Sequence, residues 1–106
     1  MKRGEVWLVS FDTSIGGEIK KTRPAVIISN NASNKALNRV QIIPITSNTD
    51  RLYPSEAYIY IEKKKHKAMA DQIATASKER LYKHIDFLST KDMLAIESVL
   101  KLQLGL

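Results

Sequence analysis

Apolar and polar residues alternate over several short segments of this chain of 106 residues. In residues 57–61 the side chains of Tyr58 and Tyr60 point to one face and those of Ile59 and Ile61 to the other, as in a half-buried antiparallel strand. Other segments rich in β-branched and aromatic residues predict further strands. We expect strands at residues 5–11, 25–29, 40–46, 57–61, 68–74 and 85–88.

The alternation gives way to helical spacing near the C-terminus. Ser89 or Thr90 can cap a final helix, and short helical turns are expected around residues 35–37 and 78–81. We therefore expect a mainly β protein with helices (α+β), in which five to six antiparallel strands curl over one C-terminal helix as a small barrel, with residues 1–106 as one domain. The apolar residues that repeat on one face of that helix are Met93, Ile96, Leu100 and Leu104.

Two prolines constrain their strands. Pro24 has no N–H, so it fits the start of a strand, and the nearly continuous apolar run after it predicts a central strand. Pro44 lies inside the expected strand 40–46, which indicates either a sheet edge or a bulge. We expect the lysine-rich residues 63–67 to form a turn.

Charge narrows the class of partner. A net charge of +6 favours nucleic acid over an acidic protein and, more distantly, an anionic membrane. The absence of cysteine excludes disulfides, thiolate chemistry and a Cys-based zinc site, and fits a reducing compartment. No apolar run approaches the roughly 20 residues of a membrane span, and the first residues lack the continuous apolar core of a signal peptide. We expect a cytoplasmic protein.

Arg23 is the leading candidate for binding an anion. Because Pro24 follows it, Arg23 is biased toward extended geometry at the junction of a loop and a strand. Its guanidinium has five donors and no accessible neutral form, so a phosphate or carboxylate is its natural partner. Thr46 ends the third expected strand and can donate its hydroxyl to the same phosphate if the two strands are neighbours. Threonine is also a common strand residue without any such role.

The loop before Arg23 combines glycine with charged residues. Gly17 lets the backbone approach a ligand, and Lys20 and Lys21 would keep Glu18 ionised. As a carboxylate, Glu18 can accept a proton from a ribose 2'-hydroxyl, which is the general-base step of RNA transesterification. The alternative is that Glu18 is simply a solvated loop residue.

Asp71 and Gln72 form a second polar pair, whose carboxylate and amide suit hydrogen bonding to the base edges of single-stranded RNA. A turn or strand-pairing role fits them equally. The lysine-rich residues 63–67 either track a phosphate backbone or are solvated. His66, expected at the surface, and His84, expected to be partly buried, have no acidic neighbours at ligand spacing, so we expect neither a metal nor another cofactor.

Six segments share their order and spacing with one known family. They are residues 3–7, 17–18, 22–30, 43–47, 71–73 and 78–81. In these segments the chain resembles the MazF/PemK toxins, the ribonuclease halves of toxin-antitoxin pairs. The resemblance implies an SH3-like barrel, a homodimer, metal-independent and sequence-specific cleavage of single-stranded mRNA, and inhibition by an acidic antitoxin. The nucleophile would be the 2'-hydroxyl of the substrate, which yields a 2',3'-cyclic phosphate and a 5'-hydroxyl.

The resemblance also implies roles for particular residues. Arg23 and Thr46 match the catalytic arginine and threonine of the family, and Glu18 matches a catalytic glutamate of some members. Some relatives have a histidine at the position of Gly17 and an arginine at that of Met69, so we favour a mechanism that uses Glu18, with Asp71 as the other possible general base. The expected RNA-binding residues are Gly17, Lys20, Lys21, Ser47, Asp71 and Gln72.

Two other functions stay open on the sequence alone. Toxins of the same barrel shape that poison gyrase depend on a C-terminal tripeptide containing tryptophan, whereas this chain ends in Leu104-Gly105-Leu106 and has its only tryptophan at Trp7. The other alternative is an RNA-binding barrel without catalysis. Analysis of RNA fragments after incubation separates all three.

Overall fold

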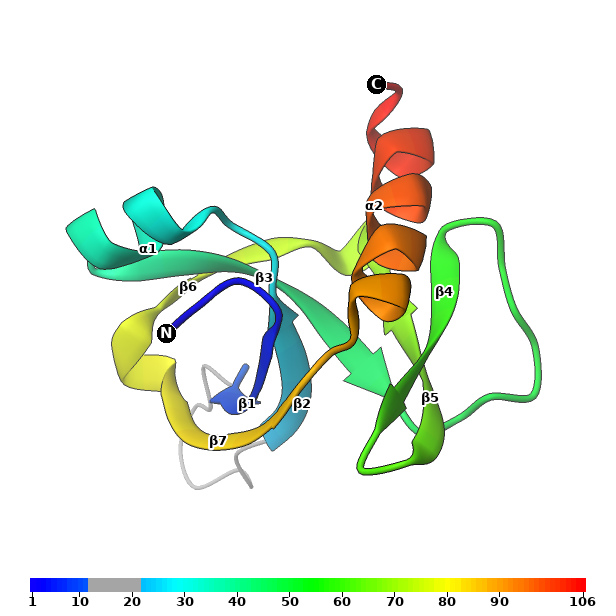
Figure 1. Ribbon diagram of the computed structural model, residues 1–106, viewed down its shortest axis with the longest axis horizontal. Coiled ribbons are helices and arrows are strands. Elements are labelled where there is room, and N and C mark those ends of the chain that lie inside the picture. Colours follow the sequence, from blue (N-terminus) through cyan, green and yellow to red (C-terminus); the bar gives the residue numbers. More distant parts are fainter. Residues whose placement is uncertain (12–21) are drawn as a thin grey trace, which may run out of the picture.

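Seven antiparallel strands form a strongly curved sheet in the computed structural model, which describes residues 1–11 and 22–106 (Figure 1). The strand order is β4-β5-β3-β2-β1-β7, with β6 paired to β3 beside this path. The expected mainly β fold is therefore confirmed, and β2 is central, between β3 and β1. The strands are β1 Glu5–Ser10, β2 Thr22–Ile27, β3 Arg39–Thr46, β4 Glu56–Ile61, β5 Lys64–Met69, β6 Ala74–Ser77 and β7 Leu81–Phe87.

Two α-helices and two 3₁₀ turns complete the described residues. They are α1 Asn31–Ala36, α2 Thr90–Leu104, η1 Ala70–Gln72 and η2 Lys78–Arg80. Ser89 caps α2 as expected, because its hydroxyl accepts a hydrogen bond from the backbone N–H of Asp92 at 3.1 Å. The helix ends at Gly105, whose φ of +71° is left-handed. No helix among the described residues is both long and apolar enough to cross a membrane.

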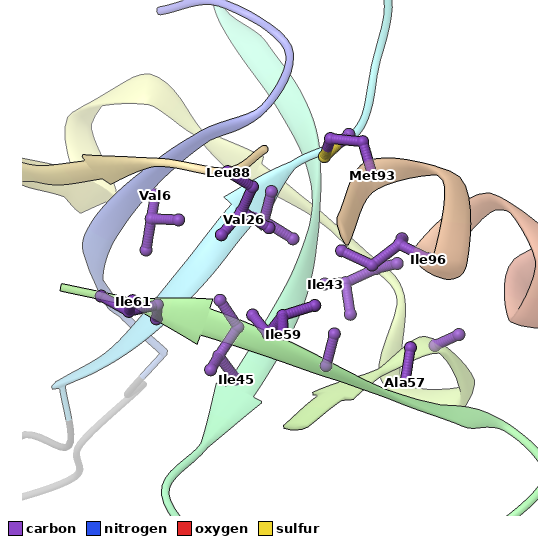
Figure 2. Packing of buried hydrophobic residues seen from close by; sticks show 12 residues of the cluster. Val6, Val26, Ile43, Ile45, Ala57, Ile59, Ile61, Leu88, Met93 and Ile96 are labelled. Carbon is purple, nitrogen blue, oxygen red and sulfur yellow. The ribbon is translucent and has the colours of Figure 1, made fainter. Parts of the chain in front are cut away.

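The two faces of the sheet carry separate apolar clusters. Val26 belongs to one, and Ala25 and Ile27 belong to the other, which explains why β2 reads as a continuous apolar run. On the first face, Met93 and Ile96 of α2 pack onto the sheet (Figure 2). A fully buried side chain of this size contributes roughly 1.5–3 kcal/mol, so this face anchors the helix. Leu100 of the predicted helical stripe also packs, partly buried, against this cluster, whereas Leu104 is exposed.

The hairpin between β4 and β5 corrects two predictions. The turn predicted at residues 63–67 occupies only Glu62 and Lys63, whose φ values of 49° and 66° are those that a two-residue hairpin loop requires. The remaining lysines therefore belong to β5. The strand predicted at residues 68–74 is wrong, because β5 ends at Met69 and η1 separates it from β6.

Pro44 marks a change of partner within β3. Residues Arg39–Ile42 pair with β6, whereas Ile45 and Thr46 pair with β5. Pro44 lies between these two stretches, so its missing N–H interrupts neither ladder. The predicted edge or bulge is thus a position at which β3 passes from one neighbouring strand to another.

Three further predictions differ from the structure, two of them near β1. The strand expected at residues 85–88 begins earlier, at Leu81, because β7 pairs along most of β1. His84 is exposed rather than partly buried, and its ring stacks on Trp7 with 5.4 Å between centroids and 25° between planes. His66, expected at the surface, is half-buried.

Candidate active site

Arg23 and Thr46 lie at corresponding positions of two neighbouring strands. In the β2–β3 pair, Ala25 is opposite Pro44 and Val26 is opposite Ile43. The paired stretch ends at Ala25 and Pro44, and Arg23 and Thr46 each lie two residues beyond that last pair on their own strands. Because side chains alternate along a strand, Arg23 lies on the same face of β2 as Ala25, and Thr46 on the same face of β3 as Pro44. β2 and β3 are neighbouring strands, as the hypothesis requires, and the meeting of Arg23 with Thr46 and their catalytic roles stay predictions.

The Arg23 side chain is exposed at the start of β2, next to Val9 of β1 in the register. No hydrogen bond or ion pair joins its guanidinium to another residue within 1–11 or 22–106. Its exposed donors are therefore accessible to a ligand, and a phosphate oxygen is the acceptor that suits their forked geometry best.

Thr46 ends β3 with a half-buried side chain. Its Oγ1 accepts a hydrogen bond from the backbone N–H of Asn48 at 3.2 Å, which leaves the hydroxyl hydrogen available to another acceptor. Ser47, a predicted RNA-binding residue, follows with an exposed side chain. In the next turn of the loop, Asn48 Oδ1 accepts from the N–H of Asp50 at 3.2 Å. The strand end that carries Thr46 thus continues into an ordered polar loop.

Asp71 and Gln72 lie on η1, not on a strand as predicted, and both are exposed. They line a pocket of about 580 Å³ together with Tyr53 and with Gln103 of α2. The amide nitrogen of Gln72 lies 3.4 Å from the sulfur of Met69. Neither member of the Arg23–Thr46 pair lines this pocket. The structure therefore separates the predicted site residues into two groups.

Four predicted site residues, Gly17, Glu18, Lys20 and Lys21, lie outside the described residues. Glu18 as the general base consequently stays a prediction. The other possible base, Asp71, belongs to the pocket described above. Among residues 1–11 and 22–106, no three histidine, aspartate or glutamate side chains are grouped so that they could hold a metal ion.

A buried ion pair that no sequence pattern indicated lies next to Thr46. Lys67 was expected in a turn that either tracks a phosphate backbone or is solvated, yet its side chain is buried and its Nζ lies 2.9 Å from Glu56 Oε1. The two residues are diagonal neighbours across the β4–β5 hairpin, where Lys67 is opposite Tyr58. The signal that identifies the pair is the two-residue turn at residues 62–63, since it fixes the register of the hairpin.

These features define a small, basic protein with a curved sheet and polar residues at one end. Comparison with known proteins gives the class of protein to which it belongs. A family model described as "PemK-like, MazF-like toxin of type II toxin-antitoxin system" matches residues 2–104. The chain belongs to this family.

Individual relatives agree with the family assignment. The chain is 33% identical to the endoribonuclease MazF9 of Mycobacterium tuberculosis, over 100% of this chain and 98% of that protein. It is also 33% identical to the endoribonuclease MazF of Staphylococcus epidermidis, over 100% of this chain and 92% of that protein. A solved mycobacterial endoribonuclease in complex with its cognate antitoxin is 27% identical with a TM-score of 0.83, over 100% of this chain and 96% of that one.

Proposed function

We propose that this protein is the toxin of a toxin-antitoxin pair and acts as a sequence-specific, metal-independent endoribonuclease on single-stranded mRNA. The observation that carries the proposal is that Arg23 lies at the start of β2 and Thr46 at the end of β3, which are neighbouring antiparallel strands. Support comes from two relatives, each 33% identical over the whole chain, that are named endoribonuclease MazF9 and endoribonuclease MazF.

In the proposed mechanism the substrate supplies the nucleophile. The ribose 2'-oxygen forms a bond to the adjacent phosphorus, and the bond from phosphorus to the 5'-oxygen of the next nucleotide breaks. Glu18 accepts the proton of the 2'-hydroxyl as general base, and the leaving 5'-oxygen takes up a proton. The products are a 2',3'-cyclic phosphate and a 5'-hydroxyl. Because no water attacks in this step, the mechanism requires neither a metal-bound hydroxide nor another cofactor.

Arg23 and Thr46 act on the charge that builds up on the phosphate. The guanidinium pairs with the non-bridging oxygens, whose negative charge increases as the fifth bond to phosphorus forms. The Thr46 hydroxyl, which already accepts from the Asn48 N–H, donates its hydrogen to one of the same oxygens. Preorganised donors of this kind stabilise the transition state more than the ground state, which is the condition for raising kcat.

The proposal extends to the partners of the toxin. An acidic antitoxin suits a chain with a net charge of +6, and a mycobacterial endoribonuclease has been solved with its cognate antitoxin. We also propose that the protein forms a homodimer, that it is cytoplasmic and that residues 1–106 form one domain. The proposed RNA contacts are Gly17, Lys20, Lys21, Ser47, Asp71 and Gln72.

The proposal is tested with matched RNA oligonucleotides. One carries a ribose at the cut position and the other a 2'-deoxyribose, and both are incubated with the protein with and without a chelator. We expect cleavage of the ribose substrate alone, at the same rate with the chelator, with a cyclic phosphate end. Equal cleavage of the deoxy substrate would refute attack by the 2'-hydroxyl, and loss of activity with the chelator would refute metal independence.

A further inference from the structure

The buried ion pair between Lys67 and Glu56 has no role in the proposed chemistry. The side chains of Lys67 and Glu56 are 7% and 9% exposed, and their charged atoms are 2.9 Å apart. Burying two charges costs solvation free energy that their attraction often does no more than offset. Stability alone is therefore a weak explanation for a pair of charges at this place.

Both members of the pair also bind the backbone of residues 47–55, the loop that joins β3 to β4 at the edge of the molecule (Figure 1). Lys67 Nζ donates to the carbonyl oxygen of Arg51. Glu56 Oε1 accepts from the N–H of Tyr53 at 2.9 Å, and the Glu56 N–H donates to the Tyr53 carbonyl at 2.9 Å. The pair thus satisfies backbone groups at two positions of the loop.

Further contacts hold the same loop. The Tyr58 hydroxyl donates to the Thr49 carbonyl at 3.1 Å. Lys67 Nζ lies 5.7 Å from the centre of the Tyr53 ring, and the guanidinium carbon of Arg51 lies 5.8 Å from it. The Tyr58 contact connects the loop to β4 and the Lys67 contact connects it to β5, whereas the Arg51 contact is between two residues of the loop itself. The ion pair is the only group among them that binds the loop backbone at two residues.

The loop begins at the candidate active site. Thr46 is directly opposite Lys67 in the β3–β5 pair, and the loop starts at the next residue. Beyond that point it exposes the amide of Asn48, the cation of Arg51 and the ring of Tyr53, which is 51% exposed. An amide, a cation and an aromatic ring are the groups that hydrogen-bond and stack with unpaired RNA bases.

We propose that Lys67 and Glu56 are positioning residues that hold the loop of residues 47–55 in the conformation that selects the RNA sequence next to the cleaved bond. The inference rests on the proposed endoribonuclease function. The ligand is the single-stranded RNA that flanks the scissile phosphate. The pair acts through the loop and does not touch the reacting atoms.

The test uses the double variant Lys67→Met/Glu56→Gln, which removes both charges and leaves no unpaired charge in the interior. Glu56→Asp keeps both charges and draws the carboxylate back from the Tyr53 N–H, so this change alone serves as a second variant if the double variant does not fold. The matched control is Arg3→Met/Glu97→Gln, because Arg3 also joins a carboxylate, at 3.1 Å, and also donates to a backbone carbonyl, that of Ile28.

Two measurements are made on each protein. Hydrogen exchange reports the opening of the loop amides, and the rates of cleavage at two different sequences within one RNA give a selectivity ratio. We expect faster exchange within residues 47–55 and a change of about tenfold to a hundredfold in the selectivity ratio for the Lys67/Glu56 variants, since small displacements in a site have effects of this size. The Arg3/Glu97 control is expected to keep the wild-type ratio.

An unchanged ratio would overturn the inference, and so would a changed ratio without faster exchange in the loop. Either result leaves the proposed function standing, since RNA is still cut. A wild-type protein that cuts no RNA would remove the proposed function and, with it, selection by the loop.

Discussion

The backbone N–H of Tyr60 donates to the carboxylate of Asp92 across 2.9 Å. Tyr60 belongs to β4, the last strand of the sheet, and Asp92 belongs to the first turn of α2. The Asp86 carboxylate accepts from the Glu62 N–H at 2.7 Å in the same way. Carboxylates of α2 and β7 thus accept hydrogen bonds from backbone N–H groups along the outer edge of β4. Among the described residues, no further strand pairs with that edge.

Replacing Asp92 with alanine is expected to lower the free energy of unfolding by about 1–3 kcal/mol, because the Tyr60 N–H loses its acceptor in a partly buried position. Urea denaturation followed by circular dichroism measures the change. Lys91→Ala is the control, since Lys91 is the exposed residue just before Asp92. Equal stability of the two variants would show that the edge contact contributes nothing.

Replacing Arg23 with alanine is expected to reduce kcat for RNA cleavage by about 100- to 1,000-fold, the usual effect of removing one transition-state donor. The fold should persist, because the side chain is exposed. The kcat of Arg23→Lys should fall between those of the wild type and Arg23→Ala, since lysine keeps the positive charge and lacks the forked geometry of the guanidinium. Arg39→Ala is the control, because Arg39 is an exposed arginine at the start of β3, whereas Thr46 is at the end of that strand. Near-normal cleavage by Arg23→Ala would exclude Arg23 from the site.

Thr46→Val keeps the shape of the side chain and removes its hydroxyl, whereas Thr46→Ser keeps the hydroxyl. We expect a loss of about 100-fold in kcat for the valine variant and near-normal activity for the serine variant. Single-turnover cleavage assays measure both. Thr75→Val is a matched control, because Thr75 is also a strand threonine whose Oγ1 accepts one hydrogen bond, from Gln41 at 3.2 Å. Similar losses at residues 46 and 75 would indicate a structural effect alone.

Glu5 links stability to pH. Burial raises the pKa of Glu5, but hydrogen bonds from Trp7 Nε1 at 2.9 Å and from the Lys2 backbone, together with the positive amino terminus and His84, outweigh burial and lower the pKa below its ordinary value. A carboxyl group with a lowered pKa in the folded state contributes stability above its unfolded pKa and loses that contribution as the pH falls through the folded pKa.

Glu5→Gln is therefore expected to lose less stability than the wild type when the pH is lowered from about 5 to about 3. Urea denaturation at several pH values measures the slope for each protein. A Glu5→Gln variant with the wild-type slope would contradict the role of this carboxyl group.

Most of the fold could be predicted from local patterns. The alternation of tyrosine and isoleucine identified β4 with the correct faces, and the cap at Ser89 identified the start of α2. The buried Lys67 could not be identified in this way, because a run of lysines is usually solvated and its partner Glu56 is eleven residues away in the sequence. Only the register of the hairpin brings these two residues together.

The residues of the candidate site could be predicted from the sequence, but only some of them were assigned to the correct kind of element. Arg23 and Thr46 stand out by their positions beside Pro24 and at the end of a strand, and the pairing of β2 with β3 makes their strands neighbours. Asp71 and Gln72 were identified as polar residues of interest but assigned to a strand, because nothing local in the sequence separates a short 3₁₀ turn from the β5 strand that precedes it.

The change of partner at Pro44 has a mechanical consequence. Arg23 is paired into the layer of β1 and β2, whereas Thr46 pairs with β5 and therefore belongs to the layer of β4 and β5. The two layers share the backbone of β3, and the hydrogen bond from the Glu62 N–H to the Asp86 carboxylate also joins them. The separation between the guanidinium of Arg23 and the hydroxyl of Thr46 therefore depends on how the two layers are joined, because no single ladder contains both residues.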